Sequence, residues 1–78
     1  MKMRITKNDL DKKAKQFNEY LKNIEIRIGY RYDYTTIDLY KKGKMLRTIV
    51  SGLTKREAYV YINAMETGLY LLDLDKDD

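Results

Sequence analysis

Apolar residues near the start of the chain recur at the spacing of a helix. Four of them follow one another at steps of four, three and four and therefore share one helical face: Leu10, Ala14, Phe17 and Leu21. Charged and amide residues occupy most positions between them. Thr6 or Asn8 can cap the first turn, where Asp9 complements the positive end of the helix dipole. The pattern predicts an amphipathic helix over about residues 8–22.

The hydrophobic period changes to two after this helix. Apolar and polar residues alternate from Ile24 to Tyr32, which is typical of a half-buried strand. Two more strands are predicted, with a turn before the first and a hairpin loop between them: the turn at 33–35, the strands at 36–40 and 45–50, and the loop at 41–44. Gly43 is expected to take the positive φ that such a loop requires.

A capping-box pattern marks the start of a second helix. In Thr54-Lys55-Arg56-Glu57, the Thr54 hydroxyl can accept from the N–H of Glu57, and the Glu57 carboxylate can accept from the N–H of Thr54. Apolar residues downstream share one face: Ala58, Tyr61, Ile62, Met65 and Leu69. Gly68 predicts the end of this helix. Residues 69–74 fit an extra helical turn, an edge strand or a hydrophobic arm, and the sequence leaves this choice open.

The order of these elements predicts an α+β fold, α-β-β-β-α, in which two helices pack on a three-stranded antiparallel sheet. Residues 1–72 form the predicted single domain, and residues 73–78 form an acidic C-terminal tail. The apolar faces of the elements supply the expected core: Leu10, Phe17, Leu21, Ile26, Ile28, Ile37, Leu39, Ala58, Ile62 and Met65.

Composition and charge narrow the class of protein. The chain has no cysteine, which suits a reducing cytoplasm, and no apolar run approaches the roughly 20 residues that span a bilayer. We therefore expect a cytoplasmic protein that does not enter the membrane. The net charge is +4, but the last six residues carry −3 and residues 1–72 carry +7. A basic body of this kind attracts nucleic acid or acidic protein surfaces.

The residue types argue against catalysis. With no histidine and no cysteine, the chain lacks the most common general base, the most reactive nucleophile and the main ligands of transition metals. Glu25, Asp33 and Asp38 lie among lysines and arginines, where solvated ion pairs are expected. The acidic tail lacks the glycine and distal glutamate of a calcium loop. We expect a protein that is not an enzyme and that has no cofactor or metal.

Tyrosine is the unusual feature of the composition, with eight residues in 78. Its ring presents apolar area with a polar tip, which favours it in interfaces. Tyr30, Tyr32 and Tyr61 are expected to fill a core that is short of other aromatic residues. Three of the remaining tyrosines and three arginines of the predicted sheet are the predicted partner-binding residues: Tyr34, Tyr40, Tyr59, Arg27, Arg31 and Arg47. Strand alternation is expected to place Arg27 and Arg31 beside Asp38, Tyr40 and Arg47 on the face opposite the helices.

Basic residues support an alternative, nucleic-acid-binding interpretation. Lysine and arginine gather at the start of the second helix and in the hairpin loop: Lys55, Arg56, Lys41, Lys42 and Lys44. Basic side chains near aromatic rings can hold a phosphate backbone and stack on bases.

The element order and the segment Gly52-Leu53-Thr54-Lys55-Arg56-Glu57-Ala58 resemble two groups of nucleic-acid binders. These are the double-stranded RNA-binding domain and the arm-binding domain of phage and transposon integrases. The first resemblance implies a phosphate-binding role for Lys55 and Arg56, although Tyr59 stands where that family continues its basic cluster. A second resemblance covers nearly the whole chain and includes the same segment together with Met65-Glu66-Thr67-Gly68-Leu69. By this resemblance the chain looks like small proteins of phages and prophages. Such a resemblance implies an accessory or inhibitory role against a host or defence machine.

Two hypotheses follow. The favoured one is a non-catalytic accessory protein that binds a host or phage protein stoichiometrically. The alternative is a nucleic-acid-binding domain that uses the basic helix start and the sheet face. The sequence leaves the oligomeric state open, with a homodimer among the alternatives.

Overall fold

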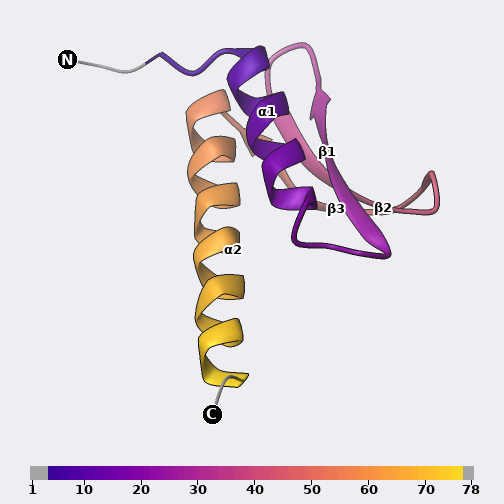
Figure 1. The fold of residues 1–78 in the computed structure, drawn as a ribbon. Coiled ribbons are helices and arrows are strands. Elements are labelled where there is room, and N and C mark those ends of the chain that lie inside the picture. The colour runs from indigo at the N-terminus through magenta and orange to yellow at the C-terminus, as the bar shows by residue number, and fades with distance from the viewer. Residues whose placement is uncertain (1–3, 77–78) are drawn as a thin grey trace.

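The computed structural model describes the backbone of residues 4–76 and the side chains of residues 4–72, and it has the predicted order α-β-β-β-α (Figure 1). Its elements follow one another along the chain: α1 (Lys7–Asn18), β1 (Ile24–Tyr30), β2 (Thr35–Lys41), β3 (Lys44–Leu53) and α2 (Lys55–Lys76). The strands form one antiparallel sheet in the order β1-β2-β3. Both helices lie on the same side of this sheet, which leaves its other face uncovered by helix.

The core lies between the two helices and the covered face of the sheet. Its fully buried members come from every element except β3: Leu10, Ala14, Phe17, Ile26, Ile37, Ala58 and Ile62. This confirms six predicted core residues and adds Ala14. The other four, Leu21, Ile28, Leu39 and Met65, are half-buried at its margin. Their aliphatic side chains line the edge of the core, which so short a chain cannot enclose completely.

Helix α1 is anchored at both of its ends. Thr6 caps its start in a capping box with Asp9, and the hydrogen bond from the backbone N–H of Thr6 holds the pKa of the Asp9 carboxyl below its ordinary value. At its end, the Asn18 amide donates to the carbonyl of Ile26 (2.9 Å) and accepts from the N–H of Ile26 (2.7 Å). The helix therefore ends at Asn18 rather than near residue 22, and Leu21 lies in the connection to β1.

Strand β3 is longer and more irregular than its partner β2. The hairpin between them is a two-residue turn, in which Lys42 and Gly43 both have positive φ (53° and 79°). This geometry matches the twist of antiparallel strands. The ten residues of β3 pair with seven of β2 through three register shifts, and Gly52 takes a φ of 76° beside one of them. The strand extends to Leu53, three residues beyond the predicted end.

Helix α2 begins at the predicted capping box and continues past the predicted stop. Thr54 and Glu57 exchange both hydrogen bonds, at 2.8 and 3.1 Å. The prediction that Gly68 ends the helix is wrong, because α2 runs through Lys76 and includes residues 69–74. Residues 73–76 of the expected acidic tail are thus helical, and Asp77 and Asp78 lie outside the described residues. In Figure 1 the last turns of α2 extend beyond α1 and the sheet.

A buried polar cluster supports the uncovered face of the sheet. Asp38 Oδ1 accepts hydrogen bonds from the hydroxyls of Thr48 (2.8 Å) and Thr36 (3.2 Å), and both Thr36 and Asp38 are buried. Gly29 lies directly opposite Thr36 in the sheet. A β-carbon at Gly29 would overlap the Thr36 hydroxyl and come within 2.8 Å of Asp38 Oδ2. The glycine therefore makes room for the cluster, as glycines inside strands often do.

Removing the α2 cap should destabilise the domain. Thr54→Ala leaves the N–H of Glu57 without its intramolecular acceptor, so we expect the free energy of unfolding to fall by roughly 0.5–2 kcal/mol, measured by urea denaturation. Thr67→Ala is the matched control, because Thr67 lies inside the same helix and only bonds back to the Asn63 carbonyl. Equal midpoints for wild type and Thr54→Ala would show that the cap contributes nothing.

Filling the space beside the polar cluster should also destabilise the sheet. Gly29→Ala forces Thr36 and Asp38 apart, and overpacking of this kind costs roughly 1–3 kcal/mol. Chemical denaturation of the variant measures the loss. An Ala variant as stable as the wild type would mean that Thr36 and Asp38 do not hold the positions described above.

Candidate binding groove at the tyrosine loop

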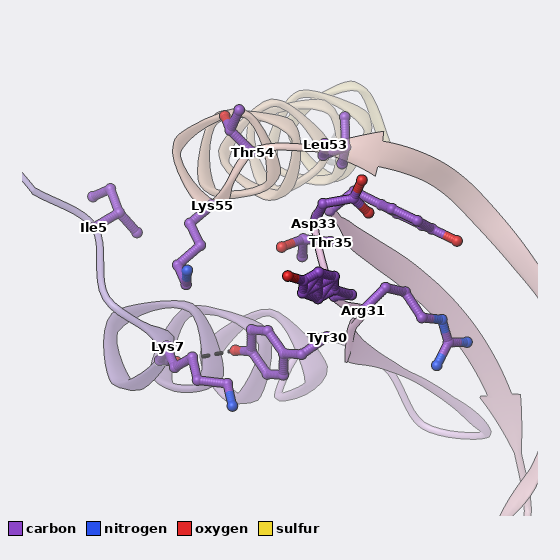
Figure 2. A pocket seen from close by; sticks show the side chains of 11 residues that line it. Ile5, Lys7, Tyr30, Arg31, Asp33, Thr35, Leu53, Thr54 and Lys55 are labelled. Carbon is purple, nitrogen blue, oxygen red and sulfur yellow. Dashed lines mark hydrogen bonds between the residues drawn. The ribbon is translucent and has the colours of Figure 1, made fainter.

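The loop between β1 and β2 and the start of α2 enclose the groove that gathers the most candidate residues. We call it the tyrosine groove; its volume is about 440 Å³. Three regions of the chain supply its lining: Ile5 and Lys7 at the start of α1, residues 30–35 around the loop, and Leu53, Thr54 and Lys55 where β3 leads into α2. Figure 2 shows these side chains around the opening between the two helix starts.

The tyrosine loop, residues 31–34, is closed by one backbone hydrogen bond. The N–H of Arg31 donates to the carbonyl of Tyr34 at 2.9 Å, which leaves Tyr32 and Asp33 at the tip. Tyr32 is 98% exposed and Tyr34 is 42% exposed. The prediction that Tyr32 belongs to the core is therefore wrong, because the strand alternation stops at Tyr30 and the loop turns the next side chains outward.

Tyr30 connects the groove wall to α1. Its hydroxyl donates to Asp11 Oδ1 (2.8 Å) and lies 3.1 Å from the carbonyl oxygen of Lys7, while Lys7 Nζ lies 4.5 Å from its ring centroid. Burial, reinforced by the hydrogen bond to Asp11, raises the pKa of Tyr30 well above its ordinary value. The ring is thus held neutral and fixed, and it forms a rigid wall for the groove.

The start of α2 brings positive charge to the opposite wall. The Lys55 side chain points from the first turn of α2 toward α1, whereas Arg31 points outward from the loop (Figure 2). Asp33 is the only acidic side chain in the lining, against Lys7, Arg31 and Lys55. The groove therefore combines tyrosine rings with a net positive charge, which can hold an anionic group beside apolar or aromatic surface.

The predicted residues of the uncovered sheet face come together only in part. The Arg27 guanidinium stacks on the Tyr40 ring at 4.2 Å and donates to Glu25. Its hydrogen bond to Glu25 raises the pKa of Arg27, which keeps the guanidinium charged. Arg47 does not join them, because the register shifts of β3 place it opposite Leu39 and put Thr48 opposite Asp38.

Tyr59 lies elsewhere, between the helices. It packs against the margin of the core, with Lys13 Nζ 5.3 Å from its ring centroid. Lys13 also forms an ion pair with Glu66 at 2.6 Å, which joins α1 to α2. Tyr59 therefore has a structural role that its place in the sequence did not indicate. Tyr61, expected in the core, is 37% exposed instead.

The basic residues fall into two separate groups. Lys55 and Arg56 follow Leu53, which pairs with Thr35 at one end of β2, whereas Lys44 pairs with Lys41 at the other end. Six residues of extended strand separate these ends by about 20 Å. Lys55 thus lines the same groove as Arg31 and Tyr34, whereas the hairpin lysines lie at the far end of the sheet.

Sequence reasoning missed Ile5, Lys7 and Tyr32 as groove residues. Asp33 directly after the alternating segment was the available signal for Tyr32, because aspartate favours turns over strands and the turn begins before it. Lys7 carried no such signal, since only the folded contact with Tyr30 brings the start of α1 to the loop.

Comparisons with protein-family models, curated proteins and solved structures gave no match. Within residues 4–76, neither helix is both long and apolar enough to cross a membrane. The described side chains contain no group of three or more aspartates or glutamates arranged to hold a metal ion. The function of the groove is therefore inferred from its own residues.

Tyr30→Phe should show how much the hydrogen bonds of the Tyr30 hydroxyl contribute to stability. Losing its hydrogen bonds should lower the free energy of unfolding by roughly 0.5–1.5 kcal/mol at neutral pH. The raised pKa stabilises the fold below the ordinary tyrosine pKa of about 10. Above that pH the unfolded chain ionises at this position first, so the advantage of wild type over Tyr30→Phe should shrink as pH rises. Urea denaturation at neutral and alkaline pH measures both values.

Tyr32→Phe provides the matched control, because Tyr32 is almost fully exposed. It should unfold like the wild type at every pH. A Tyr30→Phe deficit that stays constant through alkaline pH would contradict the raised pKa.

Proposed function

We propose that this protein is a non-catalytic accessory protein that binds one protein partner stoichiometrically through the tyrosine groove. The observation that carries the proposal is the exposed pair Tyr32 and Tyr34 on a short closed loop beside a groove. The resemblance to phage proteins suggests that binding is inhibitory: the protein would bind a host protein and block that protein's activity.

Tyrosines on this loop suit a protein interface. A tyrosine has only two side-chain torsions, so little conformational entropy is lost when it is immobilised. The loop itself is short and is closed by the bond between Arg31 and Tyr34, which lowers the further cost of ordering it. Tyr32 can therefore act as an anchor that enters a pocket of the partner.

The net positive charge of the groove favours a partner with acidic groups. Lys55 and Lys7 lie along the groove, Arg31 borders it outside, and Asp33 opposes only one of these charges. We infer that the partner presents an acidic segment beside apolar surface. Complementary charge of this kind accelerates association and fixes orientation more than it raises affinity.

A nucleic-acid function remains the alternative, supported by Lys55 at the start of α2 next to tyrosine rings. Phosphate contacts would come from Lys55 and Arg56, and bases would stack on Tyr32 and Tyr34. The separation of the hairpin lysines from this group reduces the number of phosphates that one site can contact, so we rank it second.

The protein-binding proposal predicts a specific mutational pattern. Immobilised wild-type protein should capture one defined partner from a host lysate, and Tyr32→Ala and Tyr34→Ala should each weaken its capture at least tenfold, as for anchor residues worth about 1.4 kcal/mol or more. Tyr20→Ala is the matched control, because Tyr20 is 61% exposed but lies in the connection between α1 and β1. Capture that survives both loop substitutions would refute this site.

The nucleic-acid alternative predicts the opposite dependence. Binding to duplex or single-stranded oligonucleotides should weaken steeply as salt rises, and Lys55→Ala with Arg56→Ala should flatten that slope. Fluorescence anisotropy at several salt concentrations measures it. Tight, salt-sensitive binding together with no captured protein would reverse our ranking.

A further inference from the structure

The floor of the tyrosine groove is a buried threonine at the start of β2. Thr35 is the first residue of this central strand, and it pairs with Tyr30 on one side and with Leu53 on the other. All three residues line the groove. Because side chains alternate along a strand, Thr35 lies on the same face as the core residue Ile37 and points toward the helices. Tyr30 and Leu53 thus form two walls of the groove, and Thr35 forms its floor.

The hydroxyl of Thr35 is the unusual feature of this floor. Only 4% of Thr35 is exposed, yet its Oγ1 makes no hydrogen bond to the other described residues. Every fully buried polar side-chain atom of the described residues has a partner, so the Thr35 oxygen is the part of the residue that the groove still reaches. In Figure 2 this hydroxyl points into the opening, on the side of Lys55. A hydroxyl so placed weakens the fold unless water or a ligand bonds to it. Thr35 therefore offers a hydrogen-bond donor to a molecule in the groove.

Two lysines stand beside this floor without an acidic partner. Lys55 and Lys7 come from the starts of α2 and α1, and both line the groove. Among residues 4–72, the ion pairs lie between the helices and on the uncovered sheet face, and they include neither lysine. Asp33, the acidic residue of the lining, also forms no ion pair with them. The positive charge of the groove is therefore available to an anionic ligand.

The lining of the groove favours a carboxylate over the phosphate of a nucleic-acid backbone. A donor hydroxyl and an ammonium group together match the two oxygens of one carboxylate. Ile5, Leu53 and the Tyr30 ring add apolar surface, which suits the methylene groups of a glutamate side chain. A backbone phosphate is joined to a sugar on both sides, so it lacks the thin apolar stem that can enter a recessed floor.

We propose that the floor of the tyrosine groove binds the side-chain carboxylate of a glutamate from the protein partner. Thr35 Oγ1 donates to one carboxylate oxygen and Lys55 Nζ donates to the other, while Lys7 adds positive charge at the opening. The proposal rests on the proposed function, since it names the group of the acidic segment that enters the groove. Thr35 is then the residue that sets specificity, and Tyr32 anchors the partner outside the groove.

Butyrate tests the floor without the partner, because it carries the carboxylate and the methylene groups of a glutamate side chain. Titration of the full chain should give saturable amide shifts at residues 34–36 and 55 in two-dimensional NMR spectra, whereas neutral butyramide should give none. Thr35→Val should raise the dissociation constant of butyrate at least about tenfold, as expected for a hydrogen bond to a charged group. Thr67→Val is the matched control, because Thr67 is exposed on α2 and does not line the groove.

Three results of this titration would overturn the proposal. They are a wild-type protein that does not bind butyrate, a Thr35→Val variant that binds it equally well, and butyramide that binds as butyrate does.

Removal of the Thr35 hydroxyl should leave the fold intact. Valine has the shape of threonine, and the hydroxyl has no partner among the described residues, so Thr35→Val should be at least as stable as the wild type in urea. A loss of binding in this variant is then not a loss of folding. A marked loss of stability would show that the hydroxyl bonds within the fold, and it would contradict the proposal.

Lys55→Gln and Arg56→Gln form a second matched pair. Each removes one positive charge from the first turn of α2, but only Lys55 lines the tyrosine groove, since Arg56 lines a different one. Lys55→Gln should weaken butyrate binding, and Arg56→Gln should leave it unchanged. Equal weakening by both substitutions would mean that net charge alone attracts butyrate, and it would refute a defined site.

Two comparisons separate this proposal from the two functions considered above. Inorganic phosphate should bind more weakly than butyrate; tighter binding of phosphate at the same amides would overturn the carboxylate and favour nucleic acid. Capture of a partner from lysate that is unchanged by Thr35→Val would leave the proposed function standing and overturn the glutamate site. Butyrate binding that depends on Thr35, with no partner captured, would support the site and overturn the proposed function alone.

Discussion

Helix α2 is longer than the part of the fold on which it packs, so its last turns extend beyond α1 and the sheet. Its 22 residues span about 33 Å, whereas the neighbouring helix α1 has only 12 residues. Among residues 55–72 of α2, whose side chains the structure describes, Ala58 and Ile62 are fully buried and three more residues lie at the core margin. Other apolar side chains of α2, such as Val60, Leu71 and Leu72, face solvent. Surface that the fold cannot cover internally is then available for binding another molecule.

The sheet also has a surface that the helices do not cover, since both helices lie on one of its faces. On the uncovered face, Asp38 is buried but satisfied by the hydroxyls of Thr36 and Thr48, and Gly29 leaves room for them. At the free edge of β1, Asn18 occupies both backbone groups of Ile26 and so hinders strand addition there. Polar side chains thus protect regions of the sheet that the small core cannot reach.

The parts of the fold that depend on local chemistry were predictable from the sequence. The alternation beginning at Ile24 and the Thr54–Glu57 capping box each specify their element without reference to distant residues. The failures have both local and tertiary causes. Gly68 did not end α2, because a glycine in the helical conformation only weakens a helix. Arg47 does not lie beside Arg27 and Tyr40, because β3 has register shifts that no residue pattern in the sequence indicated. Of the predicted binding residues, Arg31, Tyr34 and Lys55 meet at the tyrosine groove, whereas Lys7 enters it only through its folded contact with Tyr30.

The central claim is that the tyrosine loop beside the tyrosine groove is the surface that binds a partner. Hydrogen–deuterium exchange measured with and without the captured partner tests this most directly, because Tyr32 at the tip of the loop is almost fully exposed in the free protein. Core amides such as that of Ile62 provide an internal reference. The account predicts that protection of residues 32–34 increases on binding while the reference stays constant. Exchange at residues 32–34 that is equally fast with and without the partner would contradict it.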